Sequence, residues 1–290
     1  GVMGLLTGWT YKTPVTITNP GAVVTDYQVR IDLNTGNFNF AQANSDGSDI
    51  RFTATDGTTL LPYWVENWSA GTSGTFWVRV SSIPAGGSLT IYLYSGNASA
   101  TSASNGSATF SFFEDFEASP WTAWNKEIAG IGTLVQSADL AKRGAKSGKF
   151  DQPTGASSST VFSRASSLPG TNFVQEWDFY DDNDQTAFKM VRANYQISGG
   201  QIGLGVWTGS STTRYAFHNT GYGYTPTSVS RAVGWHKMGI TVSGGAANFF
   251  IDLSASLGSL SGLPTTFNRI SIEGIPDGPT TYYVDDFRVR

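Results

Sequence analysis

The chain shows the two-residue hydrophobic period of β-strands along most of its length. Within residues 9–17 (WTYKTPVTI), the apolar residues Trp9, Tyr11, Val15 and Ile17 occupy odd positions and are separated mostly by polar residues. This spacing is typical of a strand that buries one face. The same period returns about every ten residues, between turns rich in glycine, proline and asparagine, in 27–33, 61–65, 76–80 and 89–93. Short strands at this spacing predict an antiparallel β-sandwich.

The second part of the chain repeats this pattern after a segment without large apolar side chains. That segment, residues 95–109 (SGNASATSASNGSAT), cannot bury enough surface to offset the entropy of ordering. Beyond it, Phe173, Trp177 and Phe179 lie on one face of a predicted strand, and further strands are predicted at 202–207, 215–218, 238–242 and 284–289. We therefore predict an all-β protein with two antiparallel β-sandwich domains, at 1–97 and 110–290, joined by a linker at 98–109.

Composition narrows the class of function. The chain has 290 residues, of which 39% are hydrophobic and 13% aromatic, enough for packed cores. Charged residues are only 14%, so the surface must be built largely from Ser, Thr, Asn, Gln and Gly, a balance that favours an extracellular protein. The net charge of −4 provides no basic surface for nucleic acid, and no apolar run approaches the length of a membrane span. The lack of cysteine excludes disulfides, thiolate zinc sites and a cysteine nucleophile.

The first 97 residues resemble an uncharacterised domain of secreted bacterial and archaeal proteins. The segments that carry the resemblance are 8–20, 26–33, 47–53, 60–66, 83–87 and 91–97. The resemblance implies a secreted or cell-surface location, and it implies no activity because the family has none established. Domains of this kind often stand beside concanavalin A-like or laminin G-like modules in carbohydrate-related proteins.

The second domain resembles such a module, a concanavalin A-like jelly roll. Residues 234–242 (GWHKMGITV) and 248–252 (NFFID) are similar to a pair of strands in laminin G-like domains, with Leu253 where the family pattern has glycine. Three segments resemble the ends of calcium-containing, carbohydrate-binding β-sandwiches: 113–117 (FEDFE), 146–150 (KSGKF) and 282–287 (YYVDDF). The resemblance therefore implies a jelly roll with a carbohydrate-related role.

The same resemblance implies a structural calcium ion. In these modules the first strand, the Ser-Gly-Lys strand and the last strand meet at one edge of the sandwich. Calcium takes about six to eight oxygen ligands, and it would relieve the repulsion between carboxylates held together there. The expected ligand set of carboxylates and backbone carbonyls lies at Asp115, Glu117, Lys149, Asp285 and Asp286. The alternative is a solvated acidic edge paired with neighbouring Lys and Arg side chains.

A saccharide-binding surface combines exposed aromatic rings, which stack on the CH faces of sugars, with planar hydrogen-bonding groups. In a jelly roll one face of a sheet packs inward and the concave face is open. We expect the concave face and the loop beside it to carry the ligand-binding residues Glu176, Asp178, Arg192, Trp207, Arg214, His218, Tyr222 and Tyr224. The alternative is that Trp207 and the tyrosines pack against one another or against the first domain.

These expectations favour an extracellular protein that binds a polysaccharide or glycan without cleaving it. A second hypothesis is a structural subunit of a surface layer, fibre or adhesin that assembles with its own copies. A third is an enzyme, for instance a polysaccharide lyase that uses Arg214, His218 and one of the two loop tyrosines. Residues 176–181 (EWDFYD) are also similar to the catalytic strand of laminarinase-type glycoside hydrolases. However, Asp181 stands where that strand has its second glutamate, which argues against hydrolysis.

Overall fold

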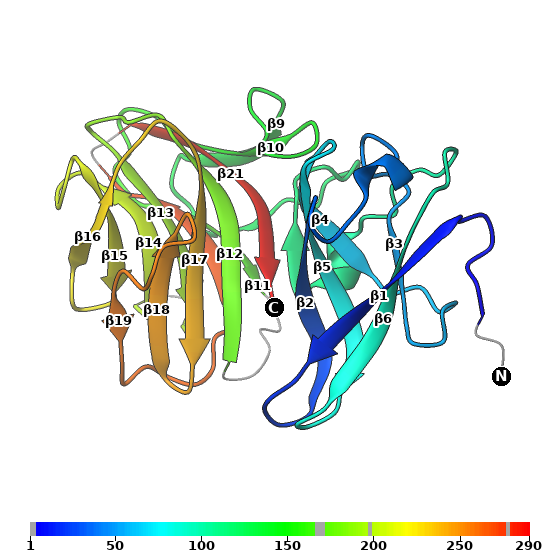
Figure 1. Cartoon of the computed structure of the whole chain (residues 1–290). Helices are drawn as coiled ribbons and strands as arrows, with labels where there is room; N and C mark the ends of the chain where they lie inside the picture. Colours follow the sequence, from blue (N-terminus) through cyan, green and yellow to red (C-terminus); the bar gives the residue numbers. More distant parts are fainter. Residues whose placement is uncertain (1–3, 166–171, 197–198, 277–278) are drawn as a thin grey trace. The chain divides into compact units, whose positions relative to one another are not determined.

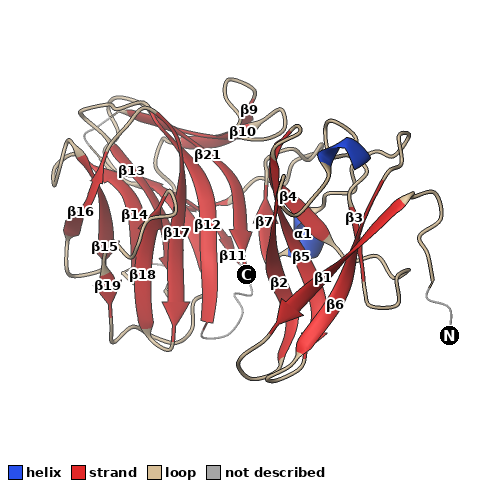
Figure 2. Ribbon diagram, in the orientation of Figure 1, coloured by secondary structure: helices blue, strands red, loops and turns tan. Residues whose placement is uncertain are grey.

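The computed structural model describes residues 4–165, 172–196, 199–276 and 279–290, and these residues form almost only β-strands and loops (Figures 1 and 2). The chain divides into two compact units, Gly1–Phe110 and Ser111–Arg290, which we call unit 1 and unit 2. Every strand pair in the described ranges is antiparallel. The prediction of an all-β chain with two antiparallel sandwiches is therefore confirmed. Among the described residues, no helix has the length and apolar character needed to cross a membrane.

Unit 1 is a sandwich of two three-stranded sheets. One has the order β1–β6–β3, formed by Tyr11–Thr18, Ser88–Ser95 and Arg51–Thr53. The other has the order β2–β5–β4, formed by Val24–Asn34, Ser73–Ile83 and Tyr63–Ser69. A short 3-10 helix (η1, Phe40–Gln42) and one turn of α-helix (α1, Gly106–Thr109) also belong to the unit. In the core between the sheets, Phe52 packs edge-on against Tyr63 and Phe76.

Residues 98–109, expected to be a linker, are instead hydrogen-bonded to unit 1. The backbone N–H of Ala103 donates to the Tyr63 hydroxyl (3.1 Å), and that of Asn105 donates to the Tyr63 carbonyl (2.7 Å). Phe110, which follows the segment, is buried in the same unit. The segment contains no large apolar side chain, but its backbone groups find partners on β4. A hydrophobicity pattern does not reveal a segment that is ordered by hydrogen bonds of its backbone.

Unit 2 is a larger sandwich whose two sheets we name after a central strand of each. The β12 sheet has the order β19–β18–β17–β12–β21–β10–β9, with β7 also paired to β21. Its strands in this order are Ser259–Leu260, Ala246–Ile251, Gly234–Ser243, Asn172–Asp181, Thr280–Val289, Ser147–Gln152, Thr133–Ser137 and Phe112–Glu114. The β13 sheet has the order β16–β15–β14–β13–β20–β11–β8. Its strands are Tyr224–Ser230, Arg214–Asn219, Gln201–Trp207, Phe188–Asn194, Arg269–Gly274, Thr160–Ala165 and Asn125–Ile128.

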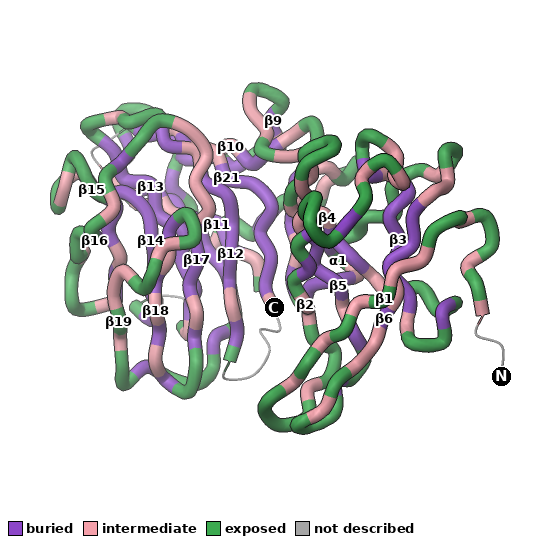
Figure 3. Tube along the Cα trace, in the orientation of Figure 1, coloured by how far each residue is buried: buried purple, intermediate pink, exposed green. Residues whose placement is uncertain are grey.

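The core of unit 2 lies between its two sheets and follows the alternation seen in the sequence. Trp177 and Phe179 of β12 belong to the same buried cluster as Val191 and Leu204 of the β13 sheet. In Figure 3 the strands carry most of the buried residues and the loops most of the exposed ones. Because each sheet uses one face for this core, unit 2 has two outer faces, one on each sheet. Side chains that alternate with core residues can lie on either of them.

Candidate functional site

Four strands of the β13 sheet place three polar side chains in one row on its outer face. Arg192 of β13 pairs with Gly203 of β14, and Gly203 pairs with His218 of β15. His218 in turn pairs with Tyr224 of β16. Val191, the neighbour of Arg192, lies in the core, so Arg192 faces away from it.

The glycine in this row allows the Arg192 side chain to cross β14. A Cβ atom at Gly203 would lie 3.2 Å from Cγ of Arg192 and 3.0 Å from Sδ of Met190. A larger side chain at this position would take the space that Arg192 uses to reach the next two strands. The sequence of β14 therefore explains how a β13 residue contacts side chains of β15 and β16.

Arg192 is the centre of a hydrogen-bonded cluster. Its Nη1 lies 2.6 Å from Nδ1 of His218, and its Nη2 donates to the Tyr224 hydroxyl at 2.9 Å. Its Nε and Nη2 also bond Oε2 of Glu273 on β20, at 2.9 and 2.7 Å. Only 2% of Arg192 is exposed, and burial of a guanidinium is costly unless its charge and its donors are matched. Glu273 matches the charge, and His218 and Tyr224 each accept one further bond.

The cluster determines the protonation state of its two rings. A guanidinium can only donate, so Nδ1 of His218 accepts from Arg192 and the ring proton resides on Nε2. Burial, together with the charge of Arg192, lowers the pKa of His218 to about 4, which keeps the ring neutral at pH 7. Burial raises the pKa of Tyr224, whose oxygen accepts from Arg192 and whose own proton stays available to donate. At neutral pH both rings therefore offer hydrogen-bond donors.

Aromatic rings form one packed layer beside this cluster. Tyr224 stacks on His218 with ring centroids 4.2 Å apart, and its ring centroid lies 6.2 Å from that of Trp207 and 5.8 Å from that of Phe188. Trp207 and Tyr224 are partly exposed, whereas Phe188 is buried. The mutual packing that the sequence left open as an alternative is therefore present. These rings, which we call the platform, are partly accessible to solvent at Trp207 and Tyr224.

Two further candidates, Arg214 and Tyr222, make other contacts. Arg214 is exposed on β15 and donates to the backbone carbonyl of Ser228. Tyr222 is 81% exposed in the turn between β15 and β16, where its backbone N–H donates to the Asn219 carbonyl. In the described part of the chain, neither side chain is hydrogen-bonded to Arg192. Both residues are close to His218 and Tyr224 in the sequence, but neither belongs to the Arg192 cluster.

Glu176 and Asp178 are not part of this surface, which corrects the sequence prediction. Both residues lie on β12 and therefore on the outer face of the other sheet. Glu176 forms ion pairs with Lys237 (3.3 Å) and Arg290. Burial acts to raise the pKa of Glu176, but the charges of Arg288, Arg290 and Lys237 hold it below its usual value. Alternation shows that a residue faces away from a core, but it does not show which sheet the residue belongs to.

Sequence reasoning missed Glu273 and Phe188. Glu273 follows Ile270 and Ile272, which both lie in the core, so the same alternation marks it as an outward position. Nothing in the sequence indicated its partner, because Arg192 is 81 residues away along the chain. The antiparallel pairing of β20 with β13 brings the two side chains together.

The residues expected to bind calcium do not come together as a ligand set. Asp115 accepts from the backbone N–H of Glu117 (3.1 Å), and Glu117 accepts from two backbone N–H groups of the loop before β10. Lys149 forms an exposed ion pair with Asp139 (2.9 Å). Across the described ranges, no three His, Cys, Asp or Glu side chains are grouped so that they could hold a metal ion.

Asp285 and Asp286 of β21 are buried, and protein donors occupy their carboxylates. Oδ2 of Asp285 accepts from the backbone N–H of Lys142 (2.9 Å), and Oδ2 of Asp286 accepts from Nη1 of Arg143 (2.9 Å). Burial, and in each case a nearby carboxylate, raises the pKa of both aspartates. The donor set at this edge does not fit a calcium ion, because a guanidinium stands beside Asp286 where a cation would bind.

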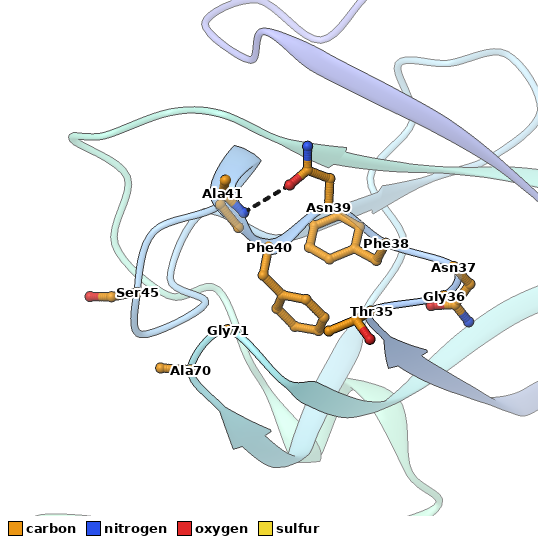
Figure 4. Close-up of a pocket in the computed structure, with 11 residues that line it drawn as sticks. Thr35, Gly36, Asn37, Phe38, Asn39, Phe40, Ala41, Ser45, Ala70 and Gly71 are labelled. Atoms are coloured by element: carbon orange, nitrogen blue, oxygen red, sulfur yellow. Dashed lines mark hydrogen bonds between the residues drawn. The ribbon is translucent and has the colours of Figure 1, made fainter.

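Unit 1 contains an open hollow of about 730 Å³ that the sequence did not indicate (Figure 4). The loop leading into η1 and the turn between β4 and β5 line it. Phe38 and Phe40 pack edge to face there, with ring centroids 5.1 Å apart. The Asn39 side chain is engaged as the cap of η1, where it accepts from the N–H of Ala41 (3.1 Å). No charged side chain belongs to the lining, and we assign the hollow no function.

One protein-family model matches part of the chain. A Domain of unknown function (DUF2341) covers residues 46–127. The match includes strands of unit 1 and the beginning of unit 2, and it carries no activity. No curated protein matches the chain.

Solved structures similar to the chain include several with carbohydrate-related names. The cellulose induced protein Cip1 is 13% identical, with a TM-score of 0.47, over 62% of this chain and 96% of that one. An endo-β-1,4-glucuronan lyase from the fungus Trichoderma reesei is 13% identical, with a TM-score of 0.41, over 62% of this chain and 95% of that one. The carbohydrate-binding module CBM66 from Bacillus subtilis is 11% identical, with a TM-score of 0.36, over 58% and 96%. Likeness at this level concerns the fold and does not assign a function.

Proposed function

We propose that the outer face of the β13 sheet binds a polysaccharide or other glycan, outside the cell, and does not cleave it. The observation that carries this proposal is the Arg192 cluster, in which one buried guanidinium orients two ring donors beside partly exposed aromatic rings. The surface composition, poor in charge, supports the extracellular setting.

The chemistry of the platform suits a sugar. The partly exposed faces of Trp207 and Tyr224 provide apolar, rigid surface for the CH groups of a pyranose ring. Nε2–H of His218 and the Tyr224 hydroxyl provide donors for sugar oxygens. Arg192 and Glu273 hold these donors in place before a ligand arrives, so little conformational entropy is lost on binding.

The protonation states support binding rather than elimination. A lyase needs a group that removes the proton next to the uronate carboxyl, and an efficient base has a pKa near the working pH. The pKa of His218 is about 4 and its Nδ1 already accepts from Arg192. Burial raises the pKa of Tyr224, so this hydroxyl stays protonated. Neither ring is poised as a base at neutral pH.

The carboxylates are equally unsuited to hydrolysis. Glycoside hydrolysis uses two carboxyl groups that flank one bond. In the hydrolase-like segment, Asp181 is buried and forms two hydrogen bonds with Arg231, at 2.7 and 3.0 Å. Glu176 lies on the outer face of the same strand, so the two carboxyl groups do not flank one site. On the β13 sheet, Glu273 is committed to Arg192.

Retention on insoluble polysaccharides and affinity electrophoresis with soluble ones test the proposal. We expect the full chain to be retained by at least one glycan, with no new reducing ends or unsaturated products after long incubation. Trp207→Ala and His218→Ala should each weaken binding at least about tenfold, equivalent to roughly 1.4 kcal/mol, because one removes ring surface and the other removes the Nε2 donor. Circular dichroism shows whether each variant is folded.

Tyr27→Ala is the matched control, because Tyr27 is an exposed aromatic residue of unit 1 (49%). It should bind as the unaltered protein does. Equal retention of the unaltered chain and both platform variants would refute the assignment of the face. Release of products would show catalysis instead of binding. Retention by no glycan, together with assembly that increases with protein concentration, would favour the structural subunit.

A further inference from the structure

We call the connection between β9 and β10, residues 138–146, the clamp loop. Two carboxylates hold its backbone, one from the loop after β7 and one from β21. Oε1 of Glu117 accepts from two consecutive backbone N–H groups of this loop, at 2.8 and 2.9 Å. Oδ2 of Asp285 accepts from another consecutive pair, at 2.9 and 3.4 Å. Both carboxylates therefore already serve the loop backbone.

The loop also brings a positive charge into a group of buried carboxylates. Nη1 of Arg143 lies 2.6 Å from Oδ2 of Asp178 and 2.9 Å from Oδ2 of Asp286. Arg288, which is fully buried, lies 2.9 Å from the same Asp178 oxygen. Asp178 and Asp286 are each 2% exposed, and carboxylates buried at such a site are costly unless cations compensate them. Two guanidinium groups of the chain provide this compensation.

We propose that Arg143 takes the place of the divalent cation that the sequence resemblance implies at this edge. The clamp loop is then fastened by the chain's own charge, and unit 2 is stable without calcium. A calcium ion requires about six to eight oxygens at roughly 2.3–2.6 Å. Of the expected ligands, Asp286 already contacts the Arg143 guanidinium, so an ion bound there would meet a second cation that repels it. This inference concerns the β12 sheet and does not depend on glycan binding.

The unaltered full-length chain provides the first test. Its thermal melting is recorded with calcium chloride and with EDTA, and calcium is titrated into the chelator-treated protein by calorimetry. We expect the same melting midpoint in both conditions and no heat of specific binding. Because a ligand that binds only the folded state raises its stability, a midpoint that rises with calcium, or a saturable binding heat, would overturn the proposal.

Variants of Arg143 provide the second test. Arg143→Ala should lower the melting midpoint of unit 2 by about 6–15 °C, because it removes the cation that contacts both Asp178 and Asp286 and leaves Arg288 on Asp178 alone. Arg143→Lys should lower it less, because an ammonium keeps the charge but cannot reproduce the planar geometry of the guanidinium. Arg30→Ala is the matched control: Arg30 pairs with Asp32 at 3.1 Å on the surface of unit 1, and such exposed pairs contribute little.

Limited proteolysis with trypsin reports on the loop itself. Lys142 is exposed within the loop, yet its backbone is held by Asp285. Below the melting temperature, we expect cleavage after Lys142 to be at least about tenfold faster in Arg143→Ala than in the unaltered chain. If Arg143→Ala does not fold, Arg143→Lys gives the same comparison with a smaller expected increase. Melting and cleavage equal to those of the unaltered chain would overturn the role of Arg143.

Discussion

Acid should destabilise unit 2 through His218. Its pKa is about 4 in the folded chain, against 6.5 for a free imidazole. Between these values the unfolded chain binds a proton that the folded chain does not, so stability is fully present above pH 6.5 and falls as the pH approaches 4. Within this window the free energy of unfolding falls by about 1.4 kcal/mol for each pH unit of acidification. We therefore expect a loss of about 3 kcal/mol, a large part of the stability of an ordinary domain.

Urea titrations of the unaltered chain and of His218→Gln, monitored by tryptophan fluorescence, measure this effect. Glutamine does not titrate, and its carbonyl oxygen can accept from Arg192 as Nδ1 does. Carboxylates and His236 titrate in both proteins, so their contributions cancel in the difference. That difference should shift in favour of His218→Gln by about 3 kcal/mol between about pH 7 and pH 4. A difference that stays constant over this range would show that His218 takes up its proton in the folded state as readily as in the unfolded chain, which would contradict a neutral ring that accepts from Arg192 at Nδ1.

Three substitutions test other parts of the fold. Leu253→Gly should stabilise unit 2 by about 0.5–1 kcal/mol in thermal melting, because Leu253 is exposed with φ +61° and only glycine adopts this conformation without strain. A destabilised variant would contradict this. Trp177→Phe should stay within about 1 kcal/mol of the unaltered chain in urea titrations. Within the described residues the buried Nε1 of Trp177 has no hydrogen-bond partner, so its removal offsets the lost packing; a loss above about 3 kcal/mol would show that the packing term dominates instead. Gly144→Ala should lower the free energy of unfolding by about 2–4 kcal/mol in urea titrations, because Gly144 has φ +68° and a Cβ there would lie 2.3 Å from Oε1 of Glu117. An unchanged midpoint would show that the clamp loop adapts to the added methyl group.

The alternation of side chains predicted much of the fold correctly. It marked Trp177 and Phe179 as core residues, and it marked Arg192 and His218 as outward ones, because neighbouring residues of a strand lie on opposite faces. This rule is local, so a sequence read ten residues at a time is sufficient to apply it. The all-β class and the two sandwiches follow from it.

The same rule could not group the outward residues into a site. It put Glu176 and Arg192 on one expected surface, although they belong to different sheets of unit 2. It also gave no sign that Arg143 would lie against Asp286, 143 residues further along the chain. The resemblance to calcium-containing modules likewise concerns short segments, and it gave no sign that a guanidinium from a loop would contact Asp286.

The amino-acid order alone settles which face of each strand is apolar, since that depends only on the two-residue period of the backbone. Which outward side chains meet depends on strand order and register, and these are set by pairings between segments far apart in the chain. The row from Arg192 through Gly203 and His218 to Tyr224 exists because three antiparallel pairings are aligned at that point. The burial that keeps His218 neutral, and the contact with Arg192 that places its proton on Nε2, exist only once that alignment has formed.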